Sequence, residues 1–197
     1  MLIDLVLKNR SYRRFDSYAS VSEEVMDQLI ELARVCPSSR NQQALKFMRV
    51  NAPEQCAQLF PCLAWAGYLK DWKGPVADER PTAYIIILGD TRLGSKFEID
   101  LGICAQTILL GAAEKNLGGC MIGSIRHEEL RSLFQIPGYL EILLVIALGK
   151  PVEKVVIDPV KDDDIRYWRD QDLTHHVPKR SLSDILADFG MLHNRFL

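Results

Sequence analysis

The stretch "FEIDLGICAQTILLGAAEKNLGG", residues 97–119, decides how this chain folds. Acids stand in its first turn and a Gly-Gly pair at 118–119 closes it, which are the signals of a helix start and a helix end. Almost every position between them is apolar, so the predicted helix has no polar face for water. We therefore expect it to be buried on every side. In a chain of 197 residues, that indicates burial of Asp100–Leu117 against a second subunit.

Shorter patterns predict further elements on both sides of this helix. The continuous apolar, β-branched runs "AYIIILG" (83–89) and "EILLVIALG" (141–149) predict buried strands. Further helices are expected at 2–8, 54–60 and 127–134, and a last short helix after Ser181 or Ser183. Another helix is expected to begin with a capping box at Ser20–Glu23 and to end before Pro37. A strand is expected at 47–50, and a strand or turn at 120–125. Residues 61–82 and 152–172 are expected to be irregular. This order mixes helices and strands without the strict alternation of a Rossmann domain.

Composition narrows the class of protein. The formal charge is −2 and 48% of residues are hydrophobic, which argues for a folded core and against nucleic-acid binding through bulk charge. No signal peptide is expected at the N-terminus, and the apolar runs are too short to span a bilayer. The five cysteines are odd in number and form no CxxC, so we expect free thiols and a reducing, cytoplasmic location.

Several common catalytic motifs are missing from the sequence. It contains no GxGxxG, GxxxxGK[ST], GxSxG or HExxH, so neither a Gly-rich nucleotide cradle nor serine-hydrolase or zincin chemistry is indicated. His175 and His176 are adjacent, and no acidic or Cys partner stands at ligand spacing, so we expect no metal site.

Two short polar stretches are the candidate binding segments. "RSYRRF" (10–15) is either a solvated basic surface or an anion site, because Arg forks and a Ser hydroxyl match phosphate oxygens. "PSSRNQQ" (37–43) could make only turn hydrogen bonds, but its amides could also serve the mixed donor and acceptor edge of a flat heterocycle. "GGCMIG" (118–123) is either a helix end or a place where Gly123 lets a backbone N–H approach a planar ligand.

Taken in order, the motifs RSxRRF, PSSxNQQxxxF, LGGCMIG, ALGxPxE and KRxLxDI resemble the FMN-dependent nitroreductase family over residues 8–186. The resemblance implies an α+β fold, a three-layer sandwich with a central mixed sheet flanked by helices. It also implies a single FMN-binding domain over 1–197 and an intertwined homodimer with FMN at the subunit interface.

The resemblance assigns site residues motif by motif. Arg10, Ser11 and Arg13 are implied to hold the FMN phosphate and the pyrimidine side of the flavin, and Ile122 and Gly123 to lie along the ring near N5. The remaining implied residues are a turn presented to the partner's flavin (Pro37, Ser38, Ser39, Asn41 and Gln43) and a basic pair returning to the phosphate (Lys179 and Arg180). No side chain is expected to be a catalytic acid, base or nucleophile, and Arg13 is expected to act electrostatically on the flavin.

The implied activity is reduction of quinones or nitroaromatics by NADH or NADPH through FMN, in a ping-pong cycle. A reductive dehalogenase-like or flavin-destroying member of the fold, a non-catalytic FMN store and an interaction domain without ligand are the alternatives. The sequence departs from the family pattern at Asn9, Ala44-Leu45, Met121 and Ser124. The loop at 63–82 matches no motif and is a candidate lid or substrate wall.

Overall fold

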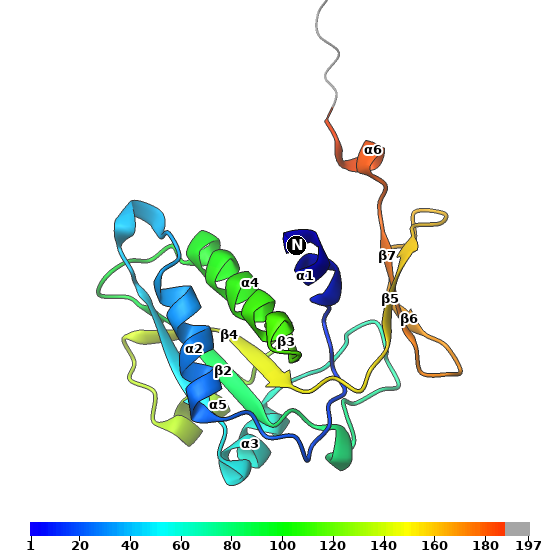
Figure 1. The fold of residues 1–197 in the computed structure, drawn as a ribbon. Helices are drawn as coiled ribbons and strands as arrows, with labels where there is room; N and C mark the ends of the chain where they lie inside the picture. The colour runs from blue at the N-terminus through cyan, green and yellow to red at the C-terminus, as the bar shows by residue number, and fades with distance from the viewer. Residues whose placement is uncertain (188–197) are drawn as a thin grey trace, which may run out of the picture. The chain divides into compact units, whose positions relative to one another are not determined.

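The computed structural model describes residues 1–187, which divide into two compact units. The first unit, Met1–Glu153, holds a four-stranded sheet and most of the helices (Figure 1). The second unit begins at Lys154 and holds a three-stranded sheet.

The sheet of the first unit has the strand order β1-β2-β4-β3. Its strands pair antiparallel and have the bounds Leu45–Val50 (β1), Ala83–Asp90 (β2), Gly118–Ile122 (β3) and Leu140–Gly149 (β4). A parallel bridge between Ser11 and Gly119 adds the N-terminal segment beside β3 and gives the sheet its mixed character. Every residue of β2 is buried, as its unbroken apolar run predicted.

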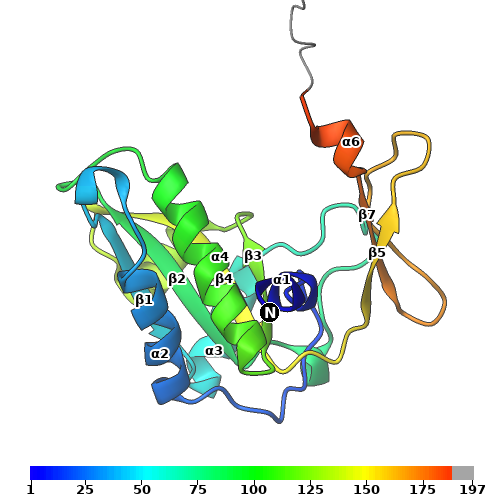
Figure 2. The same ribbon diagram turned by 45° about the horizontal axis from the view of Figure 1, so that its top comes forward.

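Helices cover both faces of this sheet. Because side chains alternate along a strand, Ile85 and Ile87 of β2 face one way, while Tyr84 and Ile86 face the other. Ile85 and Ile87 pack in one core with α2 (Glu23–Arg34) and α4 (Glu98–Glu114), which lie side by side in Figure 2. The opposite core takes side chains from α3 (Pro53–Leu59) and α5 (His127–Phe134). The α+β class and the three layers are confirmed.

The short N-terminal helix and the turns complete the first unit. Helix α1 is Leu2–Lys8, as predicted, and single turns of 3-10 helix span Ser39–Asn41, Phe60–Cys62 and Ala77–Glu79. The predicted capping box at Ser20–Glu23 is wrong, because the N-cap of α2 is Ser22, whose hydroxyl accepts from Val25 N at 3.3 Å.

Helix α4 ends earlier than the sequence predicted. It stops at Glu114, and the Gly-Gly pair lies in β3 and not in a helix cap. The glycines are needed there for close approach: a Cβ on Gly118 would lie 2.5 Å from the Tyr12 ring, and one on Gly119 would lie 2.5 Å from Ala147 O. Within one chain α4 is not buried on every side, since Ile99 is 71% exposed.

The second unit is more regular than the expected irregular tail. Strands β5 (Val155–Pro159), β7 (His175–Lys179) and β6 (Trp168–Arg169) form its sheet, with β5 parallel and β6 antiparallel to β7. Helix α6 (Leu182–Ile185) follows, and its capping box on Ser181 confirms one of the two predicted caps. Nowhere in residues 1–187 is a helix long and apolar enough to cross a membrane.

Candidate functional site

The N-terminal segment runs along the outer edge of β3. Ser11 bridges Gly119, and Tyr12 N donates to Gly119 O at 3.0 Å. The Tyr12 ring packs over the place where a Cβ of Gly118 would stand, so the glycine allows this close docking. The sheet edge therefore positions Arg10, Ser11 and Arg13, the residues implied to bind phosphate.

The two arginines of this segment differ in their partners. Arg10 Nη2 donates to Val6 O at 2.5 Å, while its buried Nε has no hydrogen-bond partner within the part of the chain that the structure describes. Arg13 is 9% exposed, its Nη1 donates to Ser11 O at 3.1 Å, and its backbone N donates to Glu153 Oε2 at 2.8 Å. A buried donor without a partner is costly, so Arg10 Nε is a group that an anion would satisfy.

Glu153 and Arg14 have roles that sequence reasoning missed. Glu153 is buried and fixes the backbone of Arg13; the last position of the "ALGKPVE" motif was its only sequence signal. Arg14 forms a two-pronged ion pair with Glu79, with Nε–Oε2 and Nη2–Oε1 distances of 2.7 and 2.5 Å. This pair raises the pKa of Arg14 through the hydrogen bond to Glu79, and it holds Arg14 in a structural contact.

The end of β3 leads into an open stretch of backbone. Ile122 is buried, whereas a Cβ on Gly123 would meet nothing within 4 Å among the described residues. The following residues are fixed, because Ile125 bridges Leu63 and Ser124 O accepts from Ala64 N at 3.0 Å. Ser11 and Gly123 thus lie along the same strand edge, separated by the length from Gly119 to Gly123, about 13 Å.

The loop at 63–82, the candidate lid or substrate wall, is packed against the rest of the unit where it begins. Leu63 pairs with Ile125, and Trp65 is 8% exposed and stacks on Phe60 with a centroid distance of 5.6 Å. Gly74 has a φ of +118°, and a Cβ there would lie 2.8 Å from the Trp65 ring. The loop is therefore anchored through Leu63 beside the segment that follows Gly123, and Trp65 and Gly74 pack within the loop.

The "PSSRNQQ" turn is held by its own side chains and by α4. Ser39 N and Oγ donate to Asp100 Oδ1 at 2.9 and 3.0 Å, and Gln43 N donates to Ser38 Oγ at 3.2 Å. Three of its residues adopt positive φ, namely Arg40, Asn41 and Gln43. Such angles cost about 1–2 kcal/mol for each non-Gly residue, so the turn needs these hydrogen bonds to persist. Pro37, Asn41 and Gln43 are exposed on its surface.

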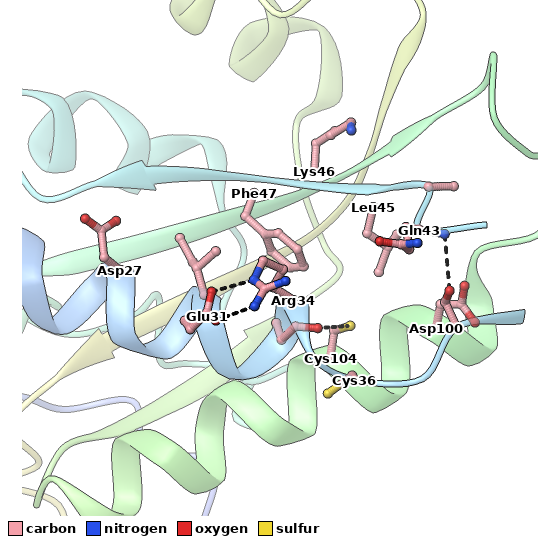
Figure 3. Close-up of a pocket in the computed structure, with 14 residues that line it drawn as sticks. Asp27, Glu31, Arg34, Cys36, Gln43, Leu45, Lys46, Phe47, Asp100 and Cys104 are labelled. Atoms are coloured by element: carbon pink, nitrogen blue, oxygen red, sulfur yellow. Dashed lines mark hydrogen bonds and ion pairs between the residues drawn. The ribbon is translucent and has the colours of Figure 1, made fainter. Parts of the chain in front are cut away.

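A cavity of about 510 Å³ opens beside this turn, between α2, β1 and the start of α4 (Figure 3). Ser38, Gln43 and Asp100 line it together with the thiols of Cys36 and Cys104. Burial, and then the neighbouring Cys36, raises the pKa of the Cys104 thiol to about 12. Cys104 therefore stays protonated near neutral pH and is unsuited to act as a nucleophile.

The two groups of predicted residues lie at opposite ends of α4. The turn is tied to Asp100 in the first turn of the helix, while Lys8 Nζ donates to Asn116 Oδ1 at 2.7 Å just past its end. A helix of 17 residues is about 25 Å long. One chain alone therefore does not bring the turn at 37–43 together with Arg10, Ser11 and Arg13. Lys179 and Arg180 belong to the second unit, where Lys179 ends β7 and Arg180 Nη1 lies 2.8 Å from Asp163 Oδ1.

The profile of the nitroreductase family matches residues 6–150. The chain belongs to the nitroreductase family. The match includes every predicted site residue except Lys179 and Arg180, and it confirms the resemblance seen in the sequence.

Individual members of the nitroreductase family show the same relationship at lower identity. The chain is 26% identical over 163 residues to an FMN reductase (NADPH) of Bacillus subtilis, an alignment covering 76% of this chain and 65% of that protein. It is 26% identical over 165 residues to an NADPH-flavin oxidoreductase of Vibrio harveyi, covering 80% and 68%.

Solved structures of the family share the fold. An FMN-dependent nitroreductase from Clostridium difficile R20291 superposes with a TM-score of 0.65 at 23% identity, covering 82% of this chain and 92% of that one. A family protein from Exiguobacterium sibiricum, solved in complex with FMN, gives a TM-score of 0.63 at 20% identity and covers 77% and 89%.

Proposed function

We propose that this protein is an FMN-dependent oxidoreductase that is reduced by NADH or NADPH and then reduces a quinone or a nitroaromatic compound in a ping-pong cycle. Two relatives that carry the names of NADPH-dependent flavin enzymes support this assignment. The observation that carries it is the edge of β3, where the orphaned Nε of Arg10 and the open backbone at Gly123 lie along one strand. When bound, FMN supplies the hydride chemistry.

The phosphate end of the proposed site fits the donors that are present. Arg10 offers a buried Nε without a partner in residues 1–187, and Ser11 adds a neutral hydroxyl. Charge-assisted hydrogen bonds contribute roughly 1.5–3 kcal/mol each, and a micromolar site requires about 8 kcal/mol. Three or four such contacts together with burial of a ring could therefore hold FMN.

The ring end fits a planar group. Because nothing described lies within 4 Å of a Cβ on Gly123, a flat ligand can rest against the backbone there. The backbone N–H of Gly123 would then be available to the bound flavin ring. The Arg13 guanidinium would stabilise negative charge on the bound flavin, and Glu153 fixes the segment that carries Arg13. No acid, base or nucleophile of the chain is needed.

We further propose that the working unit is a homodimer. Ile99, Ile103 and Leu110 lie on one face of α4 at helical spacing, with Ile99 71% exposed and the other two partly exposed. A second copy packed antiparallel on this face would bring the turn at 37–43 of one subunit to the Arg10 end of its partner. This would place residues from both subunits around each flavin.

We also propose that Lys179 and Arg180 contribute to binding of the phosphate, and that residues 1–197 act as a single FMN-binding domain. All five cysteines are free, which is compatible with the proposed cytoplasmic location.

Purified protein provides the test of the proposed function. We expect yellow protein whose released flavin runs as FMN in chromatography, and steady oxidation of NADH or NADPH when menadione is added. Initial rates at several menadione concentrations should give parallel double-reciprocal lines, as a ping-pong cycle requires. Bound FMN without turnover would support the flavin store, and protein that neither contains nor binds FMN would overturn the proposal.

A further inference from the structure

A second cavity, of about 340 Å³, is lined by residues other than the proposed flavin contacts. It is formed by the segment before α2, the start of α3, and residues 77–84, and none of the predicted FMN contacts lines it. Its apolar wall comes from Pro53, Ala57 and Pro81, and its polar lining comes from hydroxyls, an amide and one cation.

Tyr84 brings an unsatisfied hydroxyl to this cavity. The residue sits in β2, is 0% exposed, and its buried OH has no hydrogen-bond partner among residues 1–187. Buried polar atoms nearly always have a partner, so this one requires an explanation. Burial raises the pKa of Tyr84 far above its usual range, with Cys56 adding to the effect, and the phenol therefore remains a proton donor.

Arg80 brings a cation, and no ion pair joins it to a carboxylate among residues 1–187. Its guanidinium lies 4.0 Å from the centroid of the Phe60 ring, and its buried Nε has no partner in the described chain. The adjacent Glu79 is already held by Arg14. Of the described residues that line the cavity, Arg80 alone is charged. Phe60 is itself stacked on Trp65, so the surface beneath the guanidinium is fixed in place.

The other polar groups of the lining point to an acceptor-rich ligand. Thr82 Oγ1 already donates to Ala19 O at 2.9 Å, and Asn51 Nδ2 donates to Val21 O at 3.2 Å. The hydroxyls of Ser17 and Ser20 also line the cavity. Among the described residues, the Nε of Arg80 and the hydroxyl of Tyr84 have no acceptor, so the missing partner is a group with oxygen acceptors and negative charge.

We propose that this cavity is a second binding site, for a small organic carboxylate. Its carboxylate accepts hydrogen bonds from Arg80 and from the Tyr84 hydroxyl, and its apolar body rests against Pro53, Ala57 and Pro81. The volume is within the range of small-molecule sites. The site does not depend on FMN, so it can exist whether or not the proposed flavin chemistry is correct.

Calorimetric titration of the purified full chain with benzoate, in a chloride buffer, tests the proposal. Benzoate should bind, whereas the neutral isostere benzamide and inorganic phosphate should each bind at least about tenfold more weakly. Benzamide lacks the charge and phosphate lacks the apolar body, and losing one such contact corresponds to about a tenfold change in the dissociation constant. Arg80→Gln should raise the benzoate dissociation constant about tenfold or more, while the exposed control Arg49→Gln, whose partner is Asp27, should leave it unchanged.

Tyr84→Phe gives a second, independent readout. Removing an unsatisfied buried hydroxyl should raise the melting temperature of the ligand-free protein, and it should also reduce the stabilisation that benzoate confers. A purely structural Tyr84 would show no change in that ligand-dependent shift. Absence of benzoate binding at millimolar concentration, equal binding of phosphate, or unchanged benzoate affinity in both Arg80→Gln and Tyr84→Phe would overturn the proposal.

Discussion

Ser39 and Asp100 join the polar turn to the central helix through two hydrogen bonds to a single carboxylate oxygen, at 2.9 Å from the backbone N and 3.0 Å from Oγ. Asp100 is 5% exposed, so the acceptor of both bonds is buried although Ser39 itself is exposed. A carboxylate in the first turn of a helix also interacts favourably with the helix dipole. Here the carboxylate of Asp100 additionally fixes a turn with three positive φ angles.

Asp100→Ala should therefore cost about 1–3 kcal/mol of unfolding free energy, because it removes a charged acceptor from two donors. The matched control is Glu98→Ala, which removes the other first-turn acid but has an exposed side chain. Urea titration with both variants measures the difference. Equal losses would mean that Asp100 acts only through the helix dipole.

Arg10→Ala is expected to weaken FMN binding by about 1–3 kcal/mol, because it removes a charged contact to the phosphate. Arg14→Ala is the control on the same segment: it removes the ion pair between Arg14 and Glu79, and it should lower the melting temperature without changing FMN affinity. Fluorescence titration of the apoprotein with FMN gives both affinities. If Arg14→Ala weakens FMN binding as much as Arg10→Ala, the phosphate is not held by Arg10 specifically.

Gly123→Val should leave the fold intact, because its Cβ meets none of the described residues and no positive φ is required. It should nevertheless slow flavin reduction by about 10²-fold, since displacing the ring by ~1 Å disturbs hydride-transfer geometry. Single-turnover reduction by excess NAD(P)H, with FMN occupancy checked by absorbance, measures this rate.

Two other substitutions serve as controls for Gly123→Val. Glu129→Ala on α5 should reduce flavin at the unmodified rate. Gly119→Ala should instead destabilise the protein, because its Cβ would lie 2.5 Å from Ala147 O. An unchanged reduction rate in fully loaded Gly123→Val would leave Gly123 as an ordinary residue at a strand end.

Sequence patterns predicted the elements whose residues are almost all apolar. β2 was found because its apolar run is unbroken, and α4 because its apolar positions are too dense for a surface helix. The prediction that Gly118-Gly119 ends the helix was wrong, because glycine is common at helix ends but is required here for another reason. These two positions lie in β3, where Tyr12 and Ala147 approach the backbone too closely for a Cβ. Strands β5 and β7 were missed because charged residues and prolines interrupt their pattern, as at Pro178.

The site was predictable by residue type more than by arrangement. The motifs named Arg10, Ser11 and Gly123 as candidates, and only the structure shows that their segments lie along one edge of the sheet. Nothing in the sequence showed which arginine would be held by a carboxylate. Asp100 and Glu153 act through partners 61 and 140 positions away. Pairings over such distances depend on the tertiary fold, which periodicity does not report.

The face of α4 that carries Ile99 provides the test of assembly. Ile99→Asp should convert a dimer into a monomer of 22.4 kDa in light scattering and reduce FMN content, because a charge would be buried against the partner. Leu109 is unsuitable for this purpose, since it is 5% exposed within its own chain and its replacement would damage the fold. A wild-type monomer that carries FMN would refute the dimeric site.

His176 makes the second unit sensitive to pH. Its Nδ1 lies 2.7 Å from Asp158 Oδ2, its Nε2 lies 3.2 Å from Asp170 Oδ2, and its ring stacks on Trp168 at 4.0 Å. Burial lowers the pKa of His176, but the hydrogen bonds to Asp170 and Asp158 outweigh it, so the pKa lies above the ordinary 6.5. The hydrogen bond from His176 likewise lowers the pKa of Asp170 below 3.8 against the effect of burial.

These directions fix the expected pH window. The stability from protonated His176 is fully present below pH 6.5 and is lost as pH rises through its raised folded pKa. The stability from ionised Asp170 is present above pH 3.8 and is lost as pH falls through its lowered folded pKa. Amide exchange of β7, measured relative to unpaired amides, should therefore be slowest between the folded pKa values of Asp170 and His176.

The imidazole proton shift of His176 should titrate above pH 6.5. Asp158→Asn should lower the pKa of His176, since it removes one of the two carboxylates. A His176 that titrates at or below pH 6.5 in the unmodified protein would contradict the assignment.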